Sequence, residues 1–96
     1  MKVQISGKAR ADLTRAYNYL VARNPAAAEA LLAAINSKFV QLSNFPFIGR
    51  TRSELAPDLR SAVVDTVLVL YTVSTDRIVV LRVIDGRMDV HQEFHR

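Results

Sequence analysis

Pro25 divides the first half of the sequence into two helical segments. Before it, apolar residues recur at helical spacing, at positions 9, 13, 16, 17 and 20. A residue that precedes proline avoids the helical conformation, whereas proline fits the first position of a new helix. We therefore expect one helix to end at Asn24 and a second helix, capped by Asn24, to run from Ala26 to about Ser43. Ser6 is the expected cap of the first helix.

The second helix carries an apolar stripe and many alanines, which favour helix and allow a neighbouring helix to approach closely. The two segments therefore predict an antiparallel helical hairpin. The stripe consists of Ala28, Leu31, Leu32, Ile35, Phe39 and Leu42.

Strand patterns flank this hairpin. Residues 1–6 alternate apolar and polar side chains, and three β-rich runs follow at 59–64, 67–73 and 78–84, with only two and four residues between them. Runs joined so closely predict an antiparallel meander. Because its apolar face needs cover, the hairpin must lie across it. The chain is therefore expected to form a single α+β domain over residues 1–96, with an N-terminal strand and the helical hairpin packed on a small, mainly antiparallel sheet.

The remaining segments are expected to be irregular. Residues 44–57 contain two prolines and a glycine and predict a loop that carries Arg50 and Arg52. Residues 87–96 form a charged tail that Met88, Val90 and Phe94 could dock on the sheet. The aromatic residues Tyr17, Tyr19, Phe39, Phe45 and Phe47 are expected to pack in the core or the hairpin.

Composition removes several classes of protein. The chain has no cysteine, which excludes disulfide scaffolds, zinc ribbons and thiol catalysis and fits a reducing compartment. The first residues lack the apolar run of a signal peptide, and no apolar run is long enough to cross a bilayer. We therefore expect a cytoplasmic protein.

The positive charge is unevenly distributed. Ten of the thirteen basic residues are arginines, and residues 1–48 hold six basic but only two acidic residues, whereas the second half is neutral. Arginine offers a planar fork that suits carboxylate and phosphate. Arg10, Arg15 and Arg23 are therefore either a solvated helix face or a surface that attracts an acidic partner.

Arg60 and Arg82 are exceptions, because they fall within strand patterns. Counting by twos places Val80, Arg82 and Ile84 on one face of their strand. Arg82 then either pairs with a carboxylate, such as Asp65, Asp85 or Asp89, or lines a groove that binds an anionic partner.

Few residues could carry catalysis. Tyr71, His91 and His95 could move protons, Asp65 or Asp89 could act as a base, and Arg60 with Arg82 could stabilise a phosphate in a ribonuclease. His91 and His95 have the i, i+4 spacing of a metal pair but no evident third ligand, so no metal site is expected. The sequence also has no glycine-rich phosphate loop and no nucleophile elbow.

The order of these segments resembles the RelE/ParE superfamily of toxins from type II toxin–antitoxin systems, over essentially the whole chain. Within that superfamily, four stretches are most similar to the ParE branch: ARADLTRAYNYL, PFIGRTRSELAPDLRS, LVLYTV and LRVIDGRMDV.

The resemblance implies a small cytoplasmic toxin that an antitoxin neutralises by folding on it. ParE-like members poison DNA gyrase without catalysis, whereas RelE-like members cleave messenger RNA on the ribosome. In the first case DNA is contacted only through a ParD-like antitoxin, and no cofactor is expected. The residues expected to bind antitoxin or target are Arg10, Arg15, Arg50, Arg52, Arg60, Arg82, Arg87 and Phe94. A ribonuclease, the alternative, would use Arg60, Arg82, Tyr71 and His91.

The departures from each pattern favour the gyrase inhibitor. The central loop has Arg50 and Arg52 but lacks the lysines of RelE-like nucleases, and the ending follows the ParE pattern. Asp85 stands where ParE-like endings commonly have a histidine, so any partner contact of that histidine does not carry over. A third possibility is a plain interaction or DNA-binding module whose basic helices touch phosphate.

Overall fold

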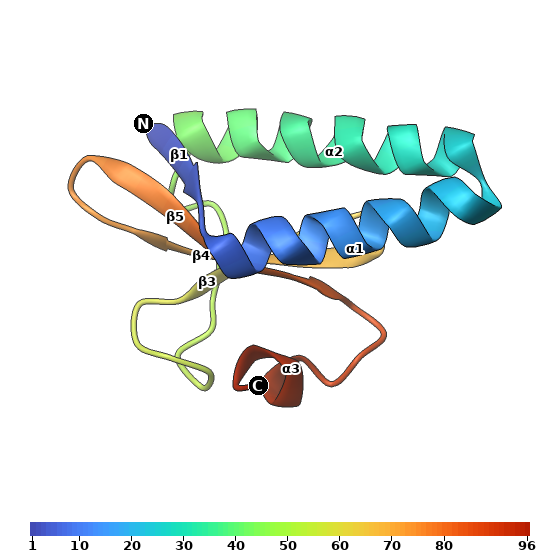
Figure 1. Ribbon diagram of the computed structural model, residues 1–96. Helices are drawn as coiled ribbons and strands as arrows, with labels where there is room; N and C mark the ends of the chain where they lie inside the picture. Colours follow the sequence, from blue (N-terminus) through green and yellow to red (C-terminus); the bar gives the residue numbers. More distant parts are fainter.

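The computed structural model describes residues 1–96, and its two long helices form an antiparallel pair (Figure 1). Helix α1 spans Gly7–Arg23 and α2 spans Pro25–Asn44. The amide of Ala9 donates to Ser6 Oγ (3.1 Å), and the amide of Ala27 donates to Asn24 Oδ1 (3.2 Å). Both predicted caps and the helical hairpin are therefore confirmed.

The strands form one mixed sheet. They are β1 (Lys2–Ile5), β2 (Arg50–Thr51), β3 (Arg60–Val64), β4 (Val67–Val73) and β5 (Arg77–Asp85), in the order β1-β5-β4-β3-β2. Strand β1 lies parallel to β5, and all other pairs are antiparallel. The α+β class and the three-stranded meander are confirmed. Strand β2 lies in the segment predicted as a loop, because two residues are too few to show an alternation.

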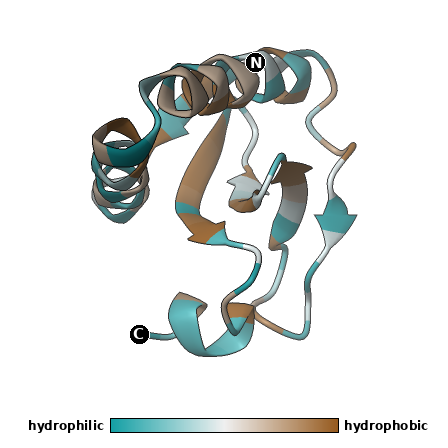
Figure 2. Cartoon of the chain, turned by 90° about the vertical axis from the view of Figure 1, so that its right-hand side faces the viewer, coloured by the Kyte–Doolittle hydropathy of each residue, from teal (hydrophilic) through white to brown (hydrophobic).

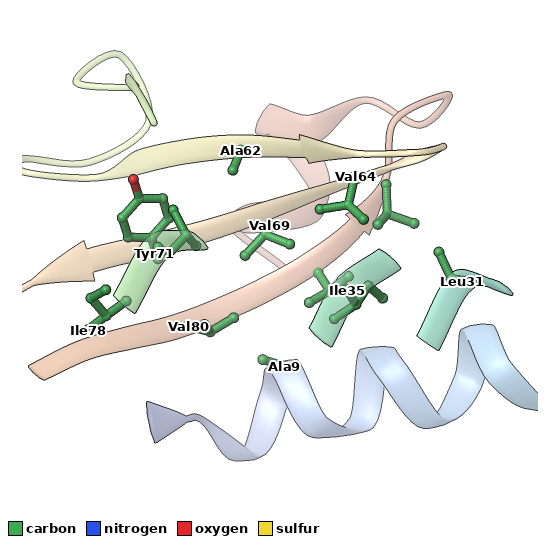
Figure 3. Packing of buried hydrophobic residues seen from close by; sticks show 12 residues of the cluster. Ala9, Leu31, Ile35, Ala62, Val64, Val69, Tyr71, Ile78 and Val80 are labelled. Carbon is green, nitrogen blue, oxygen red and sulfur yellow. The ribbon is translucent and has the colours of Figure 1, made fainter. Parts of the chain in front are cut away.

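Two apolar clusters hold the layers together. The larger one lies between the helical hairpin and the sheet and includes Leu42, Val69, Tyr71 and Val80 (Figure 3). The smaller one lies on the other face of the sheet, where the short helix α3 (Val90–Phe94) covers it (Figure 2). It consists of Leu55, Leu59, Leu70 and Ile84, with Phe94 packed against it. Val90 and Phe94 thus dock the tail as predicted, but Met88 is exposed, and the tail forms a short helix where an irregular segment was expected. None of the helices is long and apolar enough to span a bilayer.

Three of the five aromatic residues predicted to pack are instead exposed. Phe39 packs on the large cluster, and Tyr17, which is half-buried, donates to Glu29 Oε1 (3.0 Å). Tyr19, Phe45 and Phe47 are 55%, 63% and 64% exposed, so the prediction is wrong for them. The reason for two of them is local, because α2 ends at Asn44 and the chain then turns sharply toward β2 with these side chains in solvent.

Candidate functional site

A groove of about 600 Å³ lies where the carboxyl half of α1 meets one end of the sheet. Its other walls are the β3–β4 turn, the end of β5, the loop that follows β5, and α3. Half of its sixteen lining residues are hydrophobic, so the groove is amphipathic. The charged lining residues are Asp12, Arg15, Arg82, Asp85, Arg87, Glu93 and Arg96. Four cations therefore meet three carboxylates around apolar side chains.

Arg82 and Asp12 form the most buried ion pair of the chain, with side chains 12% and 5% exposed. Arg82 Nε donates to Asp12 Oδ2 (2.7 Å) and Nη2 donates to Oδ1 (3.0 Å), while the amide of Val83 also donates to Oδ2 (2.9 Å). Arg82 Nη1 donates to the carbonyl oxygen of Glu93 (2.7 Å). One guanidinium thus ties α1, β5 and α3 together. Removing either partner would leave a desolvated charge, at a cost of about 3 kcal/mol.

The paired hydrogen bonds between Arg82 and Asp12 also affect the pKa of Arg82. The hydrogen bonds and charge of Asp12 raise the pKa of Arg82, so its guanidinium stays charged at every pH at which the chain folds. The sequence offered Asp65, Asp85 and Asp89 as carboxylate partners for Arg82, but the partner is Asp12. A signal for Asp12 exists in the sequence, because it lies three residues after Ala9 and four before Ala16, on the buried stripe of α1.

A β-bulge at Leu81 moves Arg82 off the hairpin face of the sheet and onto the face that α3 covers. Arg82 and Val80 face adjacent residues of β4, so Leu81 between them is an extra residue in β5. At such a bulge, the alternation of side chains between the two faces of the sheet shifts by one residue. Val80 and Val83 consequently both face the hairpin cluster, whereas Ile84 faces the α3 cluster. The predicted common face is therefore wrong for Val80, whereas Arg82 and Ile84 do share a face.

The other groove arginines are paired only at the surface. Arg15 lies 3.4 Å from Asp12, Arg87 lies 2.7 Å from Asp85 and Arg96 lies 3.5 Å from Glu93, and all three arginines are at least 66% exposed. Exposed pairs contribute at most about 1 kcal/mol, so these arginines are free to exchange partners. Arg87 also lowers the pKa of Asp85, mainly through their hydrogen bonds.

Asp85 also stabilises the turn that follows β5. Its Oδ1 accepts from the amide of Arg87 (2.9 Å), and the amide of Gly86 donates to the carbonyl oxygen of Thr66 (2.8 Å). The turn predicted with aspartate at this position therefore forms. The carboxylate of Asp85 accepts a backbone amide two residues later, as aspartate commonly does in turns.

Arg50 and Arg52 of the central segment and Arg60 at the start of β3 lie toward the opposite end of the sheet. Arg60 Nη1 donates to the carbonyl oxygens of Phe47 (3.1 Å) and Gly49 (2.8 Å), Arg52 pairs with Glu54 (2.7 Å), and Arg50 is exposed. Of the eight predicted binding residues, the structure brings Arg15, Arg82 and Arg87 together in the groove. Arg10, Arg50, Arg52, Arg60 and Phe94 do not line it.

The residues of the ribonuclease alternative are engaged separately. The fully buried Tyr71 donates its hydroxyl proton to the carbonyl oxygen of Pro46 (2.8 Å) and accepts from the amide of Gly49 (2.9 Å). Burial raises the pKa of Tyr71, which keeps the hydroxyl protonated. Arg82 is held by Asp12. His91 is exposed on α3, which packs on the opposite face of the sheet from the hairpin cluster that contains Tyr71.

His91 of α3 lies beside His95, the residue that follows the helix. The rings of His91 and His95 have centroids 4.7 Å apart. No group of three or more histidine, aspartate or glutamate residues that could hold a metal ion occurs in the structure.

Comparison with known proteins identifies the family. Residues 3–90 match the family model described as the ParE toxin of the type II toxin–antitoxin system parDE. The chain belongs to the ParE toxin family. It is 41% identical over 80 residues to Toxin ParE3 of Caulobacter vibrioides, an overlap that covers 82% of this chain and 80% of that protein. This chain is thus a ParE-type toxin of a type II toxin–antitoxin system, as the resemblance implied.

The ParE fold is matched by a solved structure. A chain of the chromosomal ParDE toxin–antitoxin system from P. aeruginosa superposes with a TM-score of 0.75, covering 88% of this toxin and 95% of that chain at 23% identity. The helical hairpin on a mixed sheet is therefore a fold that this ParE toxin shares with that structure.

Proposed function

We propose that this ParE-type toxin acts in the cytoplasm as an inhibitor of DNA gyrase and that a ParD-like antitoxin neutralises it by binding in the groove. The amphipathic groove carries the antitoxin part of the proposal. Its apolar lining suits the apolar face of a helix, and its exposed arginines suit carboxylates on the same segment. Arg15, Arg87 and Arg96 would exchange their weak internal pairs for antitoxin carboxylates, whereas Arg82 would keep its bond to Asp12.

Two observations support gyrase inhibition over messenger cleavage. The chain has 41% identity to another ParE toxin, and three residues of the ribonuclease alternative, Arg60, Arg82 and Tyr71, already hold parts of the fold. Tyr71 in particular uses its hydroxyl to hold two backbone groups of the loop after α2. In this proposal the toxin acts by binding, without a catalytic residue or a cofactor.

A gyrase supercoiling assay with the purified toxin tests the proposal. We expect the toxin to block supercoiling and to accumulate cleaved DNA, and to leave messenger RNA intact on purified ribosomes. Adding the antitoxin should restore supercoiling. Messenger cleavage without an effect on gyrase would contradict the proposed target.

Variants of the groove test the antitoxin part separately. Combining Arg15→Glu with Arg87→Glu should weaken antitoxin binding at least about tenfold, because both exposed cations would become repulsive. Arg77→Glu is the matched control, because Arg77 begins β5 at the end away from the groove. Equal antitoxin affinity of the double variant and the control would place the antitoxin elsewhere.

A further inference from the structure

The turn after α2 displays apolar side chains to solvent. We call residues 45–48 the Phe47 turn, in which the amide of Ile48 donates to the carbonyl oxygen of Phe45 (3.1 Å). Phe45, Phe47 and Ile48 are 63%, 64% and 52% exposed. Three of the eight large apolar side chains that the chain exposes are therefore concentrated in four residues. Such a concentration on a protein surface is typical of an interaction site.

Two strand residues fix the backbone of the Phe47 turn. The hydroxyl of Tyr71 bonds to the carbonyl oxygen of Pro46 and the amide of Gly49, and Arg60 donates to the carbonyl oxygens of Phe47 and Gly49. Gly49 is buried, and a Cβ there would collide with the Tyr71 hydroxyl and come within 2.9 Å of a β3 carbonyl oxygen. A rigid turn loses little entropy when a partner binds it, so the displayed side chains are preorganised.

The surroundings of the Phe47 turn are basic. No acidic residue occurs between Glu29 and Glu54. Arg50 is exposed and forms no ion pair within the chain. Arg60 bonds only to carbonyl oxygens, and its guanidinium lies 5.1 Å from the centre of the Phe47 ring. The surface therefore combines apolar side chains with two arginines, Arg50 and Arg60, that form no ion pair, and its complement is apolar and acidic.

The Phe47 turn is separate from the groove. Strand β4 begins at Val67 in the groove wall and reaches Tyr71, which holds the turn, four residues later. At about 3.3 Å per residue the two surfaces are about 13 Å apart along the strand. A partner at the turn therefore does not need the residues that a partner in the groove uses.

We propose that the Phe47 turn is the surface through which the toxin binds an acidic, partly apolar face of its protein target. This inference rests on the proposed function, because it takes gyrase as that target. The apolar side chains outnumber the fully free cation, Arg50, which favours a protein over a nucleic acid, whose binding needs a track of phosphate contacts. A second copy of the chain fits poorly, because a two-fold contact would bring like charges together.

The test combines Phe47→Ser with Arg50→Glu and also uses Arg50→Glu alone, which alters only an exposed side chain. The matched controls are Val63→Ser and Lys2→Glu, since both residues are exposed and lie on other strands. With purified gyrase holoenzyme, we expect the double variant to require at least about tenfold more toxin for half-inhibition of supercoiling, the loss expected when one aromatic contact disappears. Its affinity for the antitoxin and the inhibition by both controls should stay within about twofold of the wild type.

Three results would overturn the inference. The double variant could inhibit gyrase as well as the wild type does, it could lose gyrase and antitoxin binding equally, or the wild type could bind a single-stranded RNA oligonucleotide that the double variant releases. If the wild type has no effect on gyrase, the proposed target is wrong, and growth arrest in cells that express the toxin alone then decides the inference. If the double variant no longer arrests growth but keeps its antitoxin affinity, the result supports a target surface at the Phe47 turn. If the double variant arrests growth as the wild type does, the inference is excluded.

Discussion

At the scale of single residues, Tyr71 links the core to the surface. Its ring belongs to the large apolar cluster, and its hydroxyl completes the hydrogen bonding of the loop after α2 (Figure 3). Gly49 is the matching choice in the loop, because a side chain there would occupy the space of the hydroxyl. The identities of the two residues therefore depend on each other.

Replacing Tyr71 with phenylalanine should destabilise the chain by about 2 kcal/mol, because the buried amide of Gly49 loses its acceptor. It should also change the alkaline limit of stability. Burial raises the pKa of Tyr71 above 10.0, so above about pH 10 the unfolded chain releases a proton that the folded chain retains. The free energy of unfolding contributed by Tyr71 is complete below that pH and falls as the pH rises toward the folded pKa.

Urea unfolding at about pH 8 and about pH 11 measures both effects. Tyr17, whose pKa the carboxylate of Glu29 raises, is present in both proteins, so the difference between wild type and Tyr71→Phe isolates Tyr71. An identical alkaline loss of stability in the two proteins would show that the buried hydroxyl does not contribute.

At the scale of elements, the sequence predicted what local patterns encode. The hairpin follows from Ser6, Asn24 and Pro25, which act within one helical turn, and the meander follows from short spacings. The bulge at Leu81 escaped prediction because it depends on pairing with β4. The partner of Arg82 escaped for the same kind of reason, since Asp12 is 70 residues away and meets Arg82 only after α1 packs on β5. The sequence therefore named three of the four groove cations, Arg15, Arg82 and Arg87, but did not show that they lie together.

Helix α3 is held to the sheet by the side chains of Val90 and Phe94 and by the hydrogen bond from Arg82. Phe94→Ala should lower the free energy of unfolding by about 1.5 kcal/mol, because the half-buried ring leaves the cluster of Leu59, Leu70 and Ile84. The amides of α3 should also exchange faster with solvent, since only Val90 and the Arg82 bond would then hold the helix. His91→Ala is the control, because His91 is exposed on the same helix and should change stability by less than about 0.5 kcal/mol. Unchanged exchange in the Phe94 variant would mean that Val90 and the Arg82 bond are sufficient to hold the helix.

At the scale of the whole molecule, part of the net charge of +4 lies on two separate surfaces. The groove holds one more cation than carboxylates, and the Phe47 turn lies in a long segment without acidic residues. An acidic antitoxin and an acidic target face would thus both be attracted, at different places. The electric field of an exposed charge decays within about 10 Å at 0.1 M salt. Attraction of the antitoxin to the groove and of the target to the Phe47 turn therefore depends on the charges at each site more than on the total charge.

Salt dependence of antitoxin association tests this division. Raising ionic strength from about 0.02 M to about 0.5 M should slow association at least about tenfold and leave dissociation within about twofold, because screening weakens steering but not the apolar contact. Arg87→Ala and Lys2→Ala each remove one charge, but only Arg87 lines the groove. At low salt, Arg87→Ala should therefore slow association more than Lys2→Ala, as measured by stopped-flow fluorescence. Equal slowing by both variants would mean that the net charge, rather than the groove, attracts the antitoxin.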